Sequence, residues 1–183
     1  MLSQAIERLW AEAERLNRPV VGSRAPGVPA SEVQAAFGGP VPEDVVTWFG
    51  YSNGVEYHPD QIQDDAALVP GYEPLSLSES RAVRDSHPFG DPVFGELFIP
   101  LLATGGGDFY AAVYDPSLKS PKVGHVMIGG ESGLVYENME SMVNAFCEFY
   151  RTGVFFVSDE GILEADDDRW VEVEAEYGAS RDS

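Results

Sequence analysis

The chain has 183 residues, of which 44% are hydrophobic, which is enough apolar material for one domain with a substantial core. Its 31 acidic and 11 basic residues give a formal net charge of -20, which disfavours contact with nucleic-acid phosphates or anionic lipid surfaces. The sequence has no signal-peptide pattern and no apolar run of about 18 residues, and its single cysteine, Cys147, has no partner for an internal disulfide. We therefore expect a cytoplasmic protein.

The first 36 residues predict two helices joined by a connector. Apolar residues recur at spacings of three and four over 2–16, which predicts an amphipathic helix. Glycines and prolines over 20–29 indicate an irregular connector. Ser31 is suited to cap a short second helix that runs through Ala36.

A third helix follows, with a polar stretch after it. We expect Pro42 in its first turn, where the missing N–H is not needed, and we expect Asn53 and Gly54 to terminate it in left-handed conformations. The polar segment 57–67 predicts a surface loop, and 68–72 is a candidate strand.

The next segment predicts a short helix and a loop. Ser76 and Glu79 form the S-x-x-E pattern of a capping box, for a helix through about Arg84. A loop rich in proline, glycine and aspartate is expected over 85–92.

The second half of the chain predicts mainly sheet. Runs at 97–102, 109–114 and 123–128 indicate three consecutive strands of an antiparallel meander, and 133–136 indicates a short fourth strand. A tight turn joins the first two, and we expect Gly106 or Gly107 to adopt positive φ and the aspartate to bond backbone N–H groups two residues on. The turn consists of Gly105, Gly106, Gly107 and Asp108.

A late helix follows the sheet. Asn138 is expected to cap it, Gly153 to end it, and its apolar face to lie on the sheet. We expect one core to contain four aromatic residues. These are Trp48, Phe109, Phe146 and Phe149.

The C-terminal part predicts one strand and one helix. The strand covers 154–157, and 170–177 fits both helical and strand periodicity. Acidic residues at 166–168 favour a helix N-terminus, with Gly178 as its end and 180–183 frayed. Together these elements predict an α+β fold in one domain, 1–183, with a central antiparallel sheet of about four to six strands flanked by N-terminal, late and C-terminal helices.

The sequence contains no recognisable catalytic or metal-binding pattern. His58 and His87 fall in predicted loops and are expected to be solvated, whereas His125 falls in a strand and is expected to pack. No histidine has a metal-ligand partner at helical spacing, and Cys147 fits a buried thiol. The turn at 105–108 lacks the lysine and the serine or threonine of a nucleotide-binding loop. We therefore expect no metal and no cofactor.

Three motifs together resemble the SUKH superfamily, which includes fungal cell-wall regulators and bacterial immunity proteins. They are PEDVVTWFGYSNG at 42–54, GGGDFY at 105–110 and NAFCEFY at 144–150, in matching order over about residues 30–152. Cys147 and Glu148 depart slightly from the usual residues between the late phenylalanines. The motif residues are Trp48, Asn53, Gly54, Gly105, Gly106, Gly107, Asp108, Phe146 and Phe149.

The resemblance implies a non-catalytic protein-binding domain, most directly an immunity protein that neutralises a cognate toxin such as a nuclease. An acidic surface would attract a basic toxin domain, although the same charge also keeps a protein soluble. Alternatives are an intracellular regulatory or scaffolding module and, third, an enzyme; the oligomeric state is open. The candidate partner contacts are Asp64, Asp65, Glu131, Glu137, Asp159 and Glu160.

Overall fold

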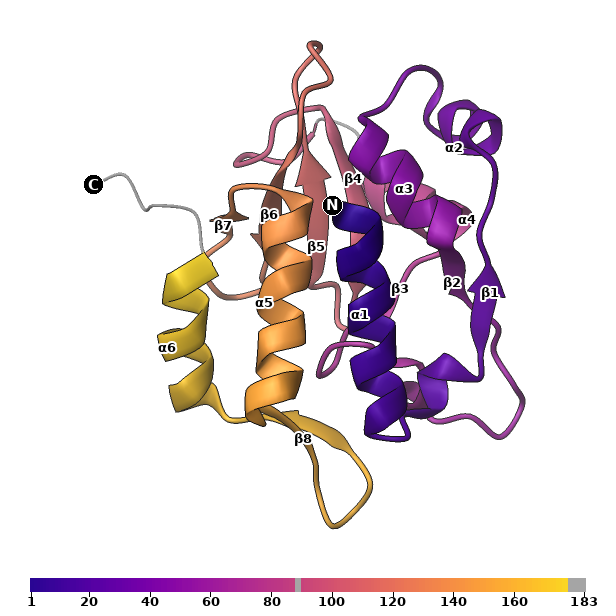
Figure 1. Ribbon diagram of the computed structural model, residues 1–183. Coiled ribbons are helices and arrows are strands. Elements are labelled where there is room, and N and C mark those ends of the chain that lie inside the picture. The colour runs from indigo at the N-terminus through magenta and orange to yellow at the C-terminus, as the bar shows by residue number, and fades with distance from the viewer. Residues whose placement is uncertain (88–89, 178–183) are drawn as a thin grey trace.

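The computed structural model describes residues 1–87 and 90–177 of an α+β fold (Figure 1). The α-helices are α1 (Leu2–Arg15), α2 (Ala30–Phe37), α3 (Glu43–Tyr51), α4 (Leu77–Asp85), α5 (Met139–Thr152) and α6 (Asp167–Tyr177). The strands are β1 (Arg24–Pro26), β2 (Ser52–Val55), β3 (Glu73–Pro74), β4 (Phe98–Ala103), β5 (Phe109–Val113), β6 (Lys122–Val126), β7 (Gly133–Tyr136), β8 (Phe155–Val157) and β9 (Leu163–Ala165). Two 3-10 helices are η1 (Pro19–Val21) and η2 (Gln63–Ala66).

The central sheet has five antiparallel strands in the order β3-β4-β5-β6-β7. Its last four strands follow one another in the chain, so the predicted meander and the predicted fourth strand are confirmed. The strands β1 and β2 pair with each other, and so do β8 and β9.

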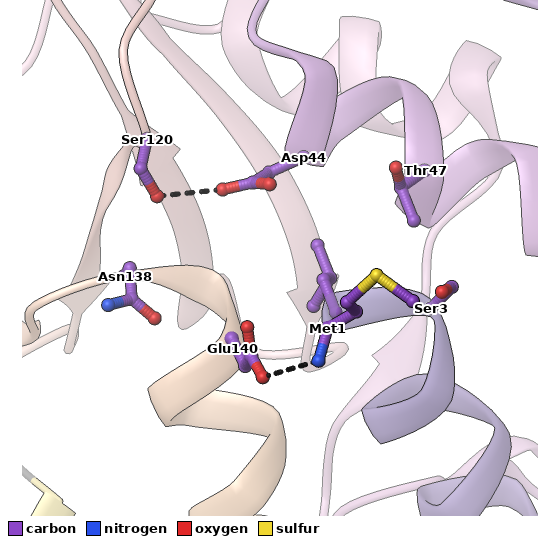
Figure 2. A pocket seen from close by; sticks show the side chains of 8 residues that line it. Met1, Ser3, Asp44, Thr47, Ser120, Asn138 and Glu140 are labelled. Carbon is purple, nitrogen blue, oxygen red and sulfur yellow. Dashed lines mark hydrogen bonds and ion pairs between the residues drawn. The ribbon is translucent and has the colours of Figure 1, made fainter.

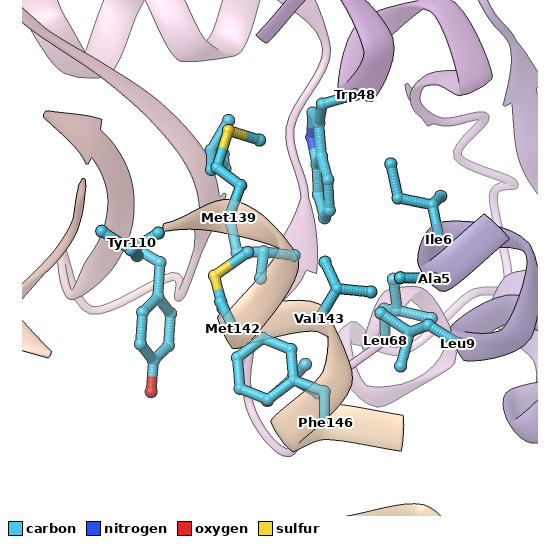
Figure 3. Close-up of a cluster of buried hydrophobic side chains, with 14 of the residues drawn as sticks. Ala5, Ile6, Leu9, Trp48, Leu68, Tyr110, Met139, Met142, Val143 and Phe146 are labelled. Carbon is cyan, nitrogen blue, oxygen red and sulfur yellow. The ribbon is translucent and has the colours of Figure 1, made fainter. Parts of the chain in front are cut away.

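One face of the sheet is covered by α5, with α1 beside it (Figure 1). The Phe146 ring meets Tyr110 of β5 and Tyr136 of β7 edge-on, with ring centroids 5.7 and 6.0 Å apart. In Figure 3 the side chains of Ala5 and Ile6 from α1 point toward the apolar face of α5. The apolar faces of both helices therefore meet in one core, and α5 lies on the sheet as predicted.

The opposite face of the sheet carries a second buried cluster, which includes Phe109. The prediction that Phe109 shares one core with Trp48, Phe146 and Phe149 is therefore wrong for Phe109, although the other three residues do belong to the same cluster. Successive residues of a strand point to opposite faces, and the neighbouring Tyr110 occupies the place against Phe146.

Two helix caps predicted from the sequence are present. The Ser76 hydroxyl accepts a hydrogen bond from the Glu79 N–H, and the Glu79 carboxylate accepts one from the Ser76 N–H at 2.8 Å. Asn138 Oδ1 accepts from the Ser141 N–H at 2.8 Å. Gly153 ends α5 in the left-handed conformation, with φ of 74°.

Two other helix starts differ by one residue from the prediction. Helix α2 begins at Ala30 after Pro29, so Ser31 lies inside the first turn and does not cap it. Helix α3 begins at Glu43, and Pro42 is the residue before it. In both cases the proline adopts an extended ψ, which directs the chain into the helix without a side-chain cap.

The prediction that Asn53 and Gly54 end α3 is wrong, because both lie in β2. Ser52 is already extended, with φ of -151°, and β2 pairs with β1 in the segment expected to be irregular. Asn53 Oδ1 instead accepts from the Leu77 N–H at 2.8 Å. Gly54 has φ of 78°, and a Cβ there would lie 2.5 Å from the Ser76 nitrogen. The glycine thus allows β2 to approach the start of α4.

Two further differences concern short elements. The candidate strand 68–72 is a tight turn closed by an isolated bridge between Val69 and Tyr72. Strand β9 was not predicted, since three residues are too few to show a period. The helix over 170–177 is confirmed as part of α6. Gly178 and 180–183 lie outside the described residues.

Candidate functional site

Charge is most concentrated in residues 155–177, which contain β8, β9 and α6 and which we name the C-terminal acidic segment. It has nine acidic residues and one basic residue, Arg169. Seven of the acidic side chains belong to exposed residues. These are Asp159, Glu160, Glu164, Asp167, Asp168, Glu172 and Glu176.

Aromatic packing holds this segment on the body of the protein. The Trp170 ring lies 4.8 Å from the Phe149 ring and 5.2 Å from the Phe155 ring, measured between centroids. Tyr136 donates a hydrogen bond to Glu174 Oε1 at 2.9 Å. Helix α6 consequently runs beside α5 (Figure 1), while its outer side carries the exposed carboxylates.

The single basic side chain of the segment, Arg169, forms hydrogen bonds to backbone carbonyls of the protein. Arg169 Nη2 donates to the Thr152 carbonyl at 2.6 Å, and Nη1 donates to the Gly153 carbonyl at 3.4 Å. A guanidinium at this point complements the partial negative charge at the C-terminal end of α5. The remaining surface of the segment is therefore acidic.

Asp159 and Glu160 lie at the tip of the β8–β9 hairpin, and both are exposed. Gly161 has φ of 83° and allows the tight return. Two apolar residues of β8, Phe156 and Val157, are each 38% exposed nearby. The structure thus brings two of the predicted contact residues into the C-terminal acidic segment.

Asp64 faces the protein rather than solvent. Its Oδ2 accepts from Arg18 Nη2 at 2.6 Å, and its Oδ1 accepts from the Leu163 N–H at 3.1 Å. The Arg18 side chain is 2% exposed and the Asp64 side chain 13%, so this is a buried ion pair. Its neighbour Asp65 accepts from the Ile62 N–H at 3.1 Å.

Glu131 and Glu137 lie at opposite ends of β7. Glu131 is exposed in the β6–β7 turn. Glu137 is exposed near the start of α5, with Oε2 3.9 Å from Lys122 Nζ. The six predicted contact residues therefore do not form one continuous surface.

The glycine turn has the predicted backbone but a different bonding pattern. Gly107 has φ of 102°, which confirms the expected positive φ. The local N–H groups of Gly106 and Asp108 donate to Thr104 Oγ1, at 3.1 and 3.2 Å. The Asp108 carboxylate instead accepts from the Ile128 N–H at 2.7 Å, so it joins this turn to the next one.

The sequence pattern does not predict that two apolar residues after β6 are exposed in a turn. The predicted strand 123–128 ends at Val126, so Met127 and Ile128 stand in the following turn, 42% and 67% exposed. Gly129 and Gly130 directly after them are the signal that favours an earlier turn.

The buried His125 contacts two tyrosine side chains, Tyr72 and Tyr110. The Tyr72 hydroxyl lies 2.6 Å from His125 Nε2, and the Tyr110 ring stacks on the imidazole with centroids 4.3 Å apart. Burial lowers the pKa of His125 and raises the pKa of Tyr72 to about 12, so both groups are neutral at pH 7. His125 packs as predicted.

His87 differs from its prediction, because it is partly buried and not simply solvated. Its ring meets Phe98 and Phe109 edge-on, at 5.9 and 5.5 Å between centroids. Phe98 and Phe109 belong to the second buried cluster, so His87 lies at the edge of that cluster.

A cavity of about 400 Å³ opens where the N-terminal ends of α1, α3 and α5 meet (Figure 2). Its two carboxylates are already engaged. Asp44 accepts from the Ser120 hydroxyl at 2.8 Å, and Glu140 pairs with the Met1 amine at 2.9 Å. Both carboxylates lie in the first turn of a helix, where the helix dipole favours negative charge. Both carboxylates thus have structural partners within the protein, and they do not indicate a ligand site in this cavity.

Over residues 1–87 and 90–177, no group of three His, Cys, Asp or Glu residues is arranged to hold a metal ion. In the same ranges, no helix combines the length and the apolar character needed to cross a membrane. Neither the models of known protein families nor the curated protein sequences match this chain. Function is therefore inferred from the surface itself.

Proposed function

We propose that the chain is a non-catalytic, SUKH-type protein-binding domain that acts as an immunity protein against a basic toxin domain. The observation that carries the proposal is the C-terminal acidic segment, where seven exposed carboxylates share one hairpin and one helix. The three motifs at 42–54, 105–110 and 144–150 support the family part of the proposal.

The electrostatics of such a surface suit a basic partner. Its field raises the rate of encounter with a cationic protein and repels nucleic acid. A nuclease binds phosphates through basic residues, so carboxylates that cover those residues would block substrate entry. Asp159 and Glu160 at the hairpin tip, with the exposed glutamates of α6, are the contacts that we assign to this role.

The cytoplasm is the compartment that we propose for this activity. The single cysteine forms no internal disulfide, and burial raises the pKa of the Cys147 thiol to about 11, which keeps it protonated and unreactive. A regulatory or scaffolding module would present the same surface. A toxin gene beside the gene for this chain would favour immunity over that alternative.

The test begins with capture of the partner from the native host on the tagged chain, followed by binding kinetics with the purified partner. We expect association to slow markedly between about 0.05 and 0.5 M salt, as the Debye length falls from roughly 14 to 4 Å, with a smaller change in dissociation.

Charge variants locate the effect. Neutralising five carboxylates of the segment, namely Asp159, Glu160, Glu164, Glu172 and Glu176, should slow association about tenfold or more. The matched control neutralises five exposed glutamates elsewhere, namely Glu7, Glu14, Glu32, Glu43 and Glu56. An equal loss in the control would refute the assigned surface. A substrate turnover that one side-chain change abolishes would refute the non-catalytic function.

A further inference from the structure

Two hairpin turns lie at the same end of the central sheet, because the strands that they join are antiparallel. These are the β4–β5 turn, 104–108, and the β6–β7 turn, 127–132. The bond from the Ile128 N–H to Asp108 Oδ1 ties them together at 2.7 Å. A Cβ placed on Gly107 would lie 3.4 Å from Ile128 Cγ1, so the isoleucine side chain covers the glycine turn.

A third loop, 57–66, lies against the same end. A Cβ placed on Gly105 would be 2.8 Å from Gln63 Nε2, which shows that the glutamine side chain rests on the glycine turn. The loop is held by the Asp65 carboxylate, which accepts from the Ile62 N–H, and by the ion pair of Asp64 with Arg18. We name the segments 57–66, 104–108 and 127–132 together the turn platform.

The turn platform presents large apolar side chains to solvent. Ile128 is 67% exposed, Ile62 56% and Met127 42%. Their backbones are fixed by the hydrogen bonds described above, and the Met127 N–H also donates to Ser132 Oγ at 3.2 Å. Branched or long apolar residues fixed on a rigid support are the type of group that anchors a protein partner.

The charge around these apolar residues has one sign. Besides Asp64, which pairs with Arg18, the three segments contain the carboxylates of Asp60, Asp65, Asp108 and Glu131, and they contain no lysine and no arginine. An acidic partner or a nucleic acid would be repelled, whereas a wholly polar basic segment would leave the apolar side chains uncovered. The complement is a segment that carries both basic and apolar side chains.

We propose that the turn platform is a docking surface for an extended protein segment in which lysine or arginine residues alternate with aliphatic ones. The apolar residues of the bound segment cover Ile128, Ile62 and Met127, and the lysine or arginine residues of that segment face the four carboxylates of the turn platform. This inference rests on the proposed binding function and adds a second contact, which supplies affinity, whereas the C-terminal acidic segment supplies attraction at long range.

The probes are two synthetic peptides of equal length and charge, one alternating lysine with leucine and one alternating lysine with serine. Each is titrated into the full chain at about 0.05 M salt, and binding is mapped by amide NMR shifts. We expect the leucine peptide to shift amides of 104–108 and 127–132 and to bind about tenfold more tightly than the serine peptide. Ile128→Ser should weaken the leucine peptide about tenfold, because it removes an apolar anchor and keeps the backbone bond to Asp108.

Val93→Ser is the matched control, since Val93 is 47% exposed and lies outside both the turn platform and the C-terminal acidic segment. It should change the affinity less than about twofold. Equal binding of the two peptides, or shifts confined to 155–177, would overturn the turn platform and leave the proposed acidic function standing. If neither peptide binds at all, both the turn platform and the proposed function of the acidic surface are overturned.

Discussion

Removal of the Asp64 carboxylate tests whether the buried ion pair with Arg18 stabilises the fold. In Asp64→Ala, the Arg18 guanidinium loses its 2.6 Å partner, and the Leu163 N–H loses its acceptor. Because the Arg18 side chain is 2% exposed, it cannot recover this interaction from water, and breaking such pairs costs about 3–5 kcal/mol. The carbonyls of Asp64 and Gly161 still accept from Arg18, which places the expected loss near the lower end, about 3 kcal/mol.

The free energy of unfolding is measured by urea denaturation with tryptophan fluorescence, and the expected loss corresponds to a fall in Tm of about 6–12 °C. Asp65→Ala is the control, because it removes the same charge from the next residue and only one capping bond, to the Ile62 N–H, for about 1 kcal/mol. The double variant Arg18→Met with Asp64→Ala should lose less than the sum of the single losses, since no unpaired charge stays buried. Equal losses for Asp64→Ala and Asp65→Ala would show that the pair contributes nothing beyond its surface charge.

Three further predictions concern the glycine turn, the core and the pH dependence. Gly107→Val should lose about 1–3 kcal/mol in urea unfolding, because φ of 102° strains a β-branched residue, and Gly106→Val should lose clearly less; similar losses would exclude backbone strain as the cause. Phe146→Ala should lose about 3–5 kcal/mol, since the ring is 0% exposed, and a loss below about 1 kcal/mol would contradict its place in the core. Burial lowers the pKa of His125 in the folded state, so its contribution to stability is present above the unfolded pKa of about 6.5 and is lost as pH falls from there through the lower folded pKa. His125→Gln should flatten the pH dependence of unfolding as pH falls below about 6.5, and an unchanged slope in this variant would disprove the linkage.

The parts of the fold that follow from local chemistry could be predicted from the sequence. The capping box at Ser76, the Asn138 cap and the positive φ of Gly107 each depend on a few neighbouring residues. The face on which an aromatic residue lies depends on how the strand is placed in the sheet. That is why Phe109 was assigned to the wrong cluster, with Tyr110 in its expected position.

The candidate site was less accessible to prediction because it depends on contacts between distant segments. Asp64 has the appearance of a surface residue in a polar loop, and only its meeting with Arg18, 46 residues away, removes it from the surface. Ile128 shows the opposite error, because a residue expected to continue a strand stands exposed in a turn. In contrast, the density of carboxylates over 155–177 is visible in the sequence, and the structure adds that Trp170 packs on Phe149 while seven of the nine acidic residues are exposed.

The pairing of α1 with α5 has a consequence for how the chain is made in the cell. The side of α1 that packs on α5 finds its partner only after more than a hundred further residues, as the bonds from Arg8 to Asn144 and from Cys147 to Ala5 show. During synthesis the apolar stripe of α1 therefore emerges from the ribosome long before α5 exists to cover it. Packing of this side of α1 must wait until α5 has been made, and a chain stalled before residue 139 presents it uncovered to chaperones and proteases, although α3 can already contact the helix.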